Sequence, residues 1–112
     1  MKKCQNTLQK GCVRYIIFRE DEMWYAVAME FNIVESGDTP QEALLLLIEA
    51  STGYVESARR VKARPTVLNQ KADAEYELMW KQVEEGKRTA KPVFSTGEFN
   101  IAPNMCGAMA LI

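Results

Sequence analysis

The stretch that decides the fold runs from residue 23 to residue 60 and reads MWYAVAMEFNIVESGDTPQEALLLLIEASTGYVESARR. Its middle carries the signature of a helix start. Thr39 and Glu42 fit a capping box, in which Thr39 accepts a hydrogen bond from the Glu42 N–H and the Glu42 side chain reaches back to the Thr39 N–H. Pro40 falls at the first helical position, where its missing N–H costs nothing. Gly37 is expected to permit the sharp turn before the helix by adopting a positive φ.

The sequence predicts a helix from Pro40 to about Arg60, because apolar residues recur at helical spacing along this segment. They include Leu44, Leu47, Ile48, Tyr54, Val55 and Ala58.

A β-hairpin is predicted upstream of this helix. Its strands are Val13 to Phe18 and Met23 to Phe31, both rich in β-branched and aromatic residues, and Glu20-Asp21-Glu22 forms a charged turn between them. Alternation along the second strand places Trp24 and Tyr25 on opposite faces of the sheet.

One helix covers one face of a small sheet, so the other face needs a second cover. We expect the long helix on the Tyr25 face. Ile16 and Phe18 are expected beside Trp24 on the other face, which a second helix or another copy of the chain would cover.

The chain after Arg60 carries weaker signals. Pro65 ends any helical run, and Thr66-Val67-Leu68 is predicted to be a short edge strand. A second helix is predicted between Asp73 as its N-cap and Gly86 just beyond its end. Residues 95–98 are expected to form a turn between two phenylalanines.

The predicted fold class is therefore α+β: a small antiparallel sheet of three to four strands with one long helix packed across it, in the order β-β-β-α-β-α. Residues 1–86 are expected to form this domain. Residues 87–112 are expected to be a C-terminal tail that docks on its own domain or on a partner, or stays mobile.

The composition of the chain argues against several classes of function. A net charge of -1 over 112 residues argues against binding of nucleic acid or an acidic membrane by general electrostatic attraction. The longest apolar run is too short to span a bilayer. The basic start of the sequence has no apolar segment behind it, so no secretory signal is expected and the default location is cytoplasmic. Three cysteines at irregular spacing agree with that location and predict free thiols, and the lack of histidine argues against a metal site. No cofactor is expected.

Charge is distributed in blocks along the chain. The predicted hairpin and the turn after it are acidic. A basic run follows the long helix and includes Arg59, Arg60, Lys62 and Arg64. Such blocks are typical of solvated faces, and the alternative is that the basic run contacts phosphate while the acidic hairpin meets a basic partner.

Catalytic motifs are absent from the sequence. Histidine general acid–base chemistry is excluded, and no phosphate-binding loop is found. The remaining candidate is a metal-dependent nuclease site built from Glu30, Glu35 and Asp38, but these alternate along a strand and its turn, which favours solvent-facing positions. We therefore expect a protein that is not an enzyme.

The same stretch resembles the N-terminal domain of HicB-like antitoxins, over roughly residues 13 to 60. In that family a strand leads through a Gly-Asp/Lys-Thr turn and a Glu-Ala pair into a leucine-rich helix. The matching residues are Trp24, Tyr25, Gly37, Asp38, Thr39, Glu42, Ala43, Leu44, Leu47, Ala50, Tyr54, Val55 and Glu56.

The resemblance implies a reduced ribonuclease-H-like fold that lacks catalytic carboxylates. It also implies a protein partner, a small basic ribonuclease toxin of the HicA type, whose active surface the antitoxin occludes. Many members carry a DNA-binding segment at the C-terminus and oligomerise through it. Because one helix at most is predicted after Arg60, the resemblance does not extend to DNA binding.

Three functional hypotheses follow: an antitoxin, a stand-alone HicB-like module that forms homo-oligomers, or an enzyme of ribonuclease-H-like ancestry. The antitoxin hypothesis is favoured. Its candidate partner-binding residues combine negative charge with one aromatic anchor, and they are Asp21, Glu22, Trp24, Glu30 and Glu35. The alternative for Trp24 is packing beneath the second helix.

Overall fold

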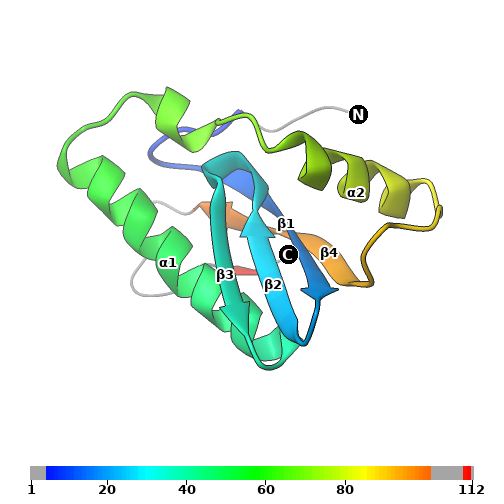
Figure 1. The fold of residues 1–112 in the computed structure, drawn as a ribbon. Helices are drawn as coiled ribbons and strands as arrows, with labels where there is room; N and C mark the ends of the chain where they lie inside the picture. Colours follow the sequence, from blue (N-terminus) through cyan, green and yellow to red (C-terminus); the bar gives the residue numbers. More distant parts are fainter. Residues whose placement is uncertain (1–4, 102–109, 112) are drawn as a thin grey trace.

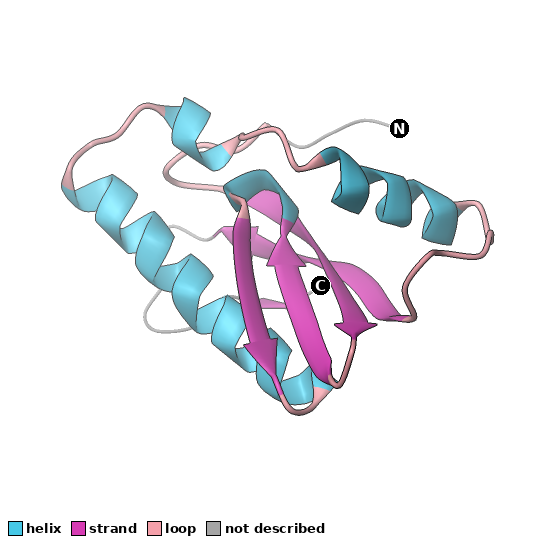
Figure 2. Ribbon diagram, viewed as in Figure 1, coloured by secondary structure: helices cyan, strands magenta, loops and turns pink. Residues whose placement is uncertain are grey.

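A computed structural model describes residues 5–101 and 110–111 of the chain. Five strands form one sheet in the order β3-β2-β1-β4-β5, with every neighbouring pair antiparallel. The elements, shown in Figures 1 and 2, are β1 (Gly11–Glu20), β2 (Met23–Ala28), η1 (Met29–Phe31), β3 (Ile33–Gly37), α1 (Pro40–Arg60), η2 (Pro65–Leu68), α2 (Ala74–Glu84), β4 (Val93–Ile101) and β5 (Ala110–Leu111), where η marks a short 3-10 helix.

The α+β class is confirmed, but the predicted order of elements after α1 is wrong. Thr66-Val67-Leu68 belongs to the 3-10 helix η2 and not to a strand. Pro65 has no N–H for a sheet ladder, and it begins this short helix, whose Leu68 is fully buried. The strand that joins the sheet is β4, and it follows α2.

The hairpin forms where it is predicted, with different limits. Asp21 and Glu22 make a two-residue turn between Glu20 and Met23, which are paired across the strands. β2 stops at Ala28 because the chain turns through η1 and then through Asn32, whose φ is 55°. Asparagine tolerates this left-handed conformation better than most residues.

α1 spans the predicted residues and is capped as expected in one respect. Thr39 Oγ1 accepts a hydrogen bond from the Glu42 N–H at 3.1 Å. The Glu42 carboxylate accepts instead from the N–H of Asp38, one residue earlier than a capping box requires. The prediction for Gly37 is wrong in its cause, because Gly37 is not among the residues with positive φ. A Cβ there would lie 2.8 Å from the backbone nitrogen of Ala43, so close approach of the helix demands glycine.

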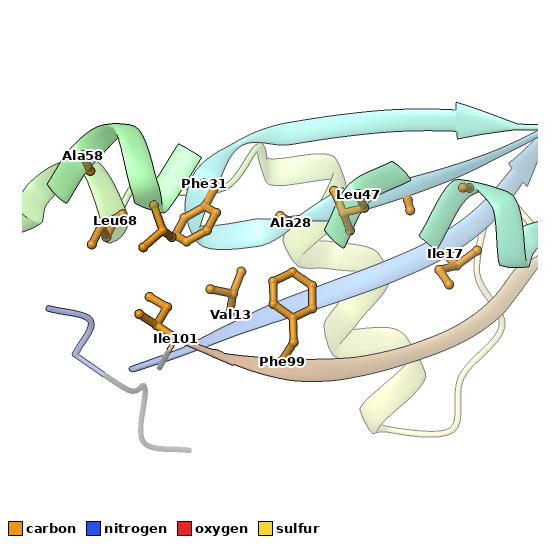
Figure 3. Close-up of a cluster of buried hydrophobic side chains, with 12 residues drawn as sticks. Val13, Ile17, Ala28, Phe31, Leu47, Ala58, Leu68, Phe99 and Ile101 are labelled. Carbon is orange, nitrogen blue, oxygen red and sulfur yellow. The ribbon is translucent and has the colours of Figure 1, made fainter. Parts of the chain in front are cut away.

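Each face of the sheet has its own helix and its own core. α1 packs on a cluster that includes Val13, Ile17, Ala28 and Phe99, and Figure 3 shows these side chains between the helix and the sheet. Trp24 packs at the edge of this cluster.

α2 covers the opposite face, over Ile16, Phe18, Val27 and Met29. The predicted assignment of faces was therefore reversed. Ile16 is paired with Val27 in the register and so lies on the face opposite Trp24. The alternation along the strand is as predicted, but sequence periodicity contains no information on which helix covers which face.

α2 begins and ends as predicted. Asp73 caps it by accepting from the Glu75 N–H, and Gly86 has a φ of 71° just after the last turn. Met79 and Trp80 are its buried residues. No helix in the described parts of the chain is both long and apolar enough to cross a membrane.

β4 shows that the expected turn at residues 95–98 is wrong. The strand runs straight through this segment and pairs with β1 from Gly11↔Ile101 to Phe18↔Val93, with one irregularity between Ile17 and Phe18. The Tyr15 ring lies over Gly97, where a Cβ would be 2.7 Å from the Tyr15 hydroxyl. The domain boundary expected at residue 86 thus falls between α2 and β4, a strand of the same sheet. Residues 102–109 and 112 of the expected tail lie outside the described residues.

Candidate interaction surface at the hairpin tip

The turn between β1 and β2 places two of the predicted partner-binding residues in solvent. Asp21 and Glu22 are both exposed at the tip of the hairpin. Asp21 has a φ of 58°, a conformation that aspartate adopts more readily than most residues. The tip is therefore a fixed, negatively charged projection at one end of the sheet.

Trp24 lies just behind this tip and is half-buried. Its ring makes an edge-on contact with Phe94, with 5.8 Å between the ring centroids. The Arg19 guanidinium lies over the Trp24 ring at 5.6 Å. Trp24 packs on the α1 side of the sheet, so the alternative that it packs beneath the second helix is wrong.

Phe94 is the functional candidate that the sequence analysis missed. Its side chain is 53% exposed although it contacts Trp24. It belongs to β4, and seventy positions separate it from Trp24 in the sequence. An aromatic residue next to a β-branched one signals a strand. Its position beside Trp24 depends on the pairing of β4 with β1, which no local pattern contains.

Glu35 lies on the same face as Trp24. It is paired with Ala26 in β2, while Trp24 is paired with Gly37, so Glu35 occupies a diagonal position two residues along β3. Diagonal neighbours in an antiparallel sheet lie within reach of large side chains. Glu35 is partly exposed and extends the negative charge of this face.

Glu30 does not belong to this surface, and its assignment as a partner-binding residue is wrong. It is 6% exposed, and its carboxylate accepts from the backbone N–H of Arg14 at 2.8 Å and from Arg14 Nε at 2.6 Å. The two terminal nitrogens of Arg14 donate to Glu77 of α2. A buried carboxylate needs such partners, and Arg14 of β1 supplies both of them while it also joins Glu30 of η1 to Glu77 of α2.

Arg14 stays charged at the centre of this group. Burial by itself lowers the pKa of the guanidinium, but the hydrogen bonds to Glu77 and Glu30 outweigh that effect and raise the pKa above its ordinary value. The Arg14 guanidinium also lies over the Trp80 ring at 5.3 Å. These contacts give Glu30 a structural role between the sheet and α2.

The carboxylates proposed for a nuclease site are separated. Glu30 is engaged with Arg14, whereas Glu35 lies on the face covered by α1. Asp38 sits at the exposed start of α1. No group of three potential metal ligands is found among the described residues.

The predicted nucleic-acid residues lie at the other end of α1. Arg59 is half-buried and its Nε donates to the carbonyl of Leu8 at 2.6 Å. Arg60, Lys62 and Arg64 are exposed. α1 is roughly 30 Å long, and Figure 1 shows it running from beside the β1–β2 turn to its far end near η2.

Cys12 contradicts the expectation of free thiols, because it is disulfide-bonded. It lies in β1 and is 8% exposed.

No family model, curated protein or solved structure matches the chain. The candidate surface thus rests on its own residues. The tip carboxylates, Glu35 and the Trp24–Phe94 pair combine negative charge with an apolar anchor, a combination suited to binding a basic protein.

Proposed function

We propose that this chain is a non-enzymatic, antitoxin-like protein that binds and occludes a small basic ribonuclease toxin of the HicA type. The observation that carries the proposal is the pairing of Trp24 with the exposed Phe94 beside an acidic hairpin tip. The resemblance of residues 13 to 60 to HicB-like antitoxins supports the same conclusion, and with it a relation to the ribonuclease-H-like fold.

The proposed mechanism is steric and electrostatic blockade. A ribonuclease that binds RNA presents basic residues, and the carboxylates of Asp21, Glu22 and Glu35 complement them without performing chemistry. Trp24 is held by Phe94 and Arg19, so little side-chain entropy is lost when a partner covers it. The exposed part of the Trp24–Phe94 pair supplies an apolar contact, which the carboxylates around it cannot provide.

Co-purification tests the proposal directly. The tagged chain is expressed with its genomic neighbours, and a small basic protein is expected to co-purify in stoichiometric amount. Its ribonuclease activity is expected to appear when the tagged chain is removed. If no such protein binds, the toxin-binding function is wrong.

Substitutions then test the surface. Trp24→Ala and Asp21→Lys are each expected to weaken partner binding about tenfold or more, the effect of losing a binding hot spot. Glu84→Lys provides the matched control, because it makes the same change of charge at an exposed position of α2. If Trp24→Ala and Asp21→Lys bind like Glu84→Lys, the hairpin surface is not the toxin site.

A second candidate function is a stand-alone module that forms homo-oligomers. An open strand edge on β4 favours this second function. β5 pairs only with Phe99 and Asn100 of β4, and among the described residues no strand pairs with the outer edge from Val93 to Glu98. Strand edges of this kind pair readily with another chain. Light scattering on the purified chain distinguishes the two, since a stable oligomer without a co-purifying protein supports this candidate.

A further inference from the structure

An open apolar hollow lies at the C-terminal end of α1, far from the hairpin tip. It has a volume of about 230 Å³ and is lined by Tyr54, Ser57, Ala58, Val61, Ala63 and Val67. Val61, on its lip, is 72% exposed. A valine this exposed at a helix end gains nothing from the core of its own chain.

The walls of the hollow are fixed by hydrogen bonds. The Tyr54 hydroxyl donates to the carbonyl of Val67 at 2.7 Å, and the side-chain amide of Gln70 donates to both groups. These bonds join η2 to α1. The hollow is therefore already shaped before any ligand arrives, which lowers the cost of binding.

The helix end beneath the hollow adopts an unfavourable conformation at Lys62. The N–H of Ala63 bonds to the carbonyl of Ala58 at 2.9 Å and that of Lys62 to the carbonyl of Arg59 at 3.1 Å, the pattern of a Schellman cap. Lys62 occupies the position at which such a cap usually has glycine, and its φ is 53°. A lysine here is less favourable for folding than glycine, yet it places a cation beside the hollow.

Three cations flank the apolar lining. Arg60, Lys62 and Arg64 alternate along the chain with the lining residues Val61 and Ala63. All three are exposed, and no ion pair within the described residues involves them. Positive charge around an apolar hollow complements a partner with the opposite charge and one apolar side chain.

We propose that this hollow binds a short acidic peptide segment of a protein partner, inserting one apolar side chain between α1 and η2 while its carboxylates meet Arg60, Lys62 and Arg64. A peptide is favoured over nucleic acid because the lining is mainly aliphatic. Its aromatic residue, Tyr54, packs on Phe31 with ring centroids 5.0 Å apart and uses its hydroxyl internally. Base stacking needs an aromatic face that is open to the ligand.

Backbone amide NMR on the full chain tests this inference. The probe is a synthetic peptide with a central leucine flanked by glutamates, and it is expected to shift the amide signals from Tyr54 to Val67. Control peptides replace the leucine by serine or the glutamates by lysines, and an oligouridylate tests the nucleic-acid alternative. If the acidic leucine peptide causes no shift at millimolar concentration, or if only the oligouridylate binds, the inference is wrong.

Variants locate the site without damage to the fold. Lys62→Gly is expected to fold at least as stably as the natural chain, because glycine suits the left-handed position, and yet to bind the acidic peptide about fivefold more weakly. Val61→Ser is expected to lose at least as much by removing the apolar lip.

Lys81→Ala is the matched control, because it removes one exposed lysine from α2. Equal binding by Lys62→Gly and Lys81→Ala would overturn the inference. The acidic hairpin surface lies at the other end of α1, so either site can fail in its test while the other holds.

Discussion

Single residues in this chain show how little a charged side chain in the sequence reveals about its place in the fold. Glu22 and Glu30 both look like surface carboxylates of an acidic hairpin. The first is exposed at the turn, whereas the second is buried and bonded to Arg14. Removal of a buried carboxylate leaves its hydrogen-bond donors without an acceptor, which is far more costly than the loss of a surface carboxylate.

Glu30→Ala is expected to lower the free energy of unfolding by about 3 kcal/mol, because it leaves the Arg14 N–H and Nε without their acceptor. Urea denaturation followed by circular dichroism measures this. Glu22→Ala, the control at the exposed turn, is expected to change it by less than about 0.5 kcal/mol. Equal losses in the two variants would show that Glu30 is not held as described.

Among the elements, α2 is attached to the sheet by ion pairs as well as by apolar contacts. It buries Met79 and Trp80 and leaves Leu78 56% exposed. Ion pairs hold it at two points: Glu77 binds Arg14, and Glu75 binds Lys91, which also binds Glu20 at 2.8 Å. Lys91 thus connects the start of α2 to the end of β1 through the segment that leads into β4.

The attachment of α2 through the ion pairs of Lys91 is expected to weaken at alkaline pH. The hydrogen bonds to Glu20 and Glu75 raise the pKa of Lys91 above its ordinary value of 10.5. A raised pKa in the folded state means that this stabilisation is fully present below the ordinary value and is lost as the pH rises through the folded-state pKa. The test is the urea concentration at the midpoint of unfolding, measured from pH 8 upward for the natural chain and for Lys91→Met. Above about pH 10 this midpoint is expected to fall more steeply for the natural chain. Parallel curves for the two proteins would show that Lys91 makes no contribution.

For the whole molecule, the decisive element is β4. It pairs with β1 along almost its entire length and contributes Phe99, which is fully buried against the face that α1 covers. Without β4, β1 becomes an edge strand, and Val13 and Tyr15 lose their β4 partners Phe99 and Gly97. Residues 1–86 therefore lack one of the central strands of their own sheet.

A chain that stops at residue 86 is expected not to fold, because deletion of β4 uncovers the core around Phe99 and leaves β1 unpaired on one side. Loss of the cooperative thermal transition in circular dichroism is the expected result. A chain that stops at residue 101 is the matched comparison, since it keeps β4. A cooperative transition in the shorter chain would show that β4 is dispensable.

The sequence by itself determined the local elements. The Thr39 cap, the helix from Pro40 to Arg60, the two-residue turn at Asp21 and the second helix between Asp73 and Gly86 follow from interactions within a few residues of one another. Side-chain caps, turn conformations and helical periodicity act over that range, so they can be read directly from the order of residues.

Tertiary structure decided which strands pair, which helix covers which face, and which charges are buried. β4 joins β1 although about eighty positions separate them in the chain, and this pairing alone places Phe94 beside Trp24. Glu30 is buried because α2 returns over β1 and supplies Glu77 to the same arginine. Each outcome depends on contacts between segments that are distant in sequence. Their selection is made by burial of apolar surface in the whole fold, which no local pattern encodes.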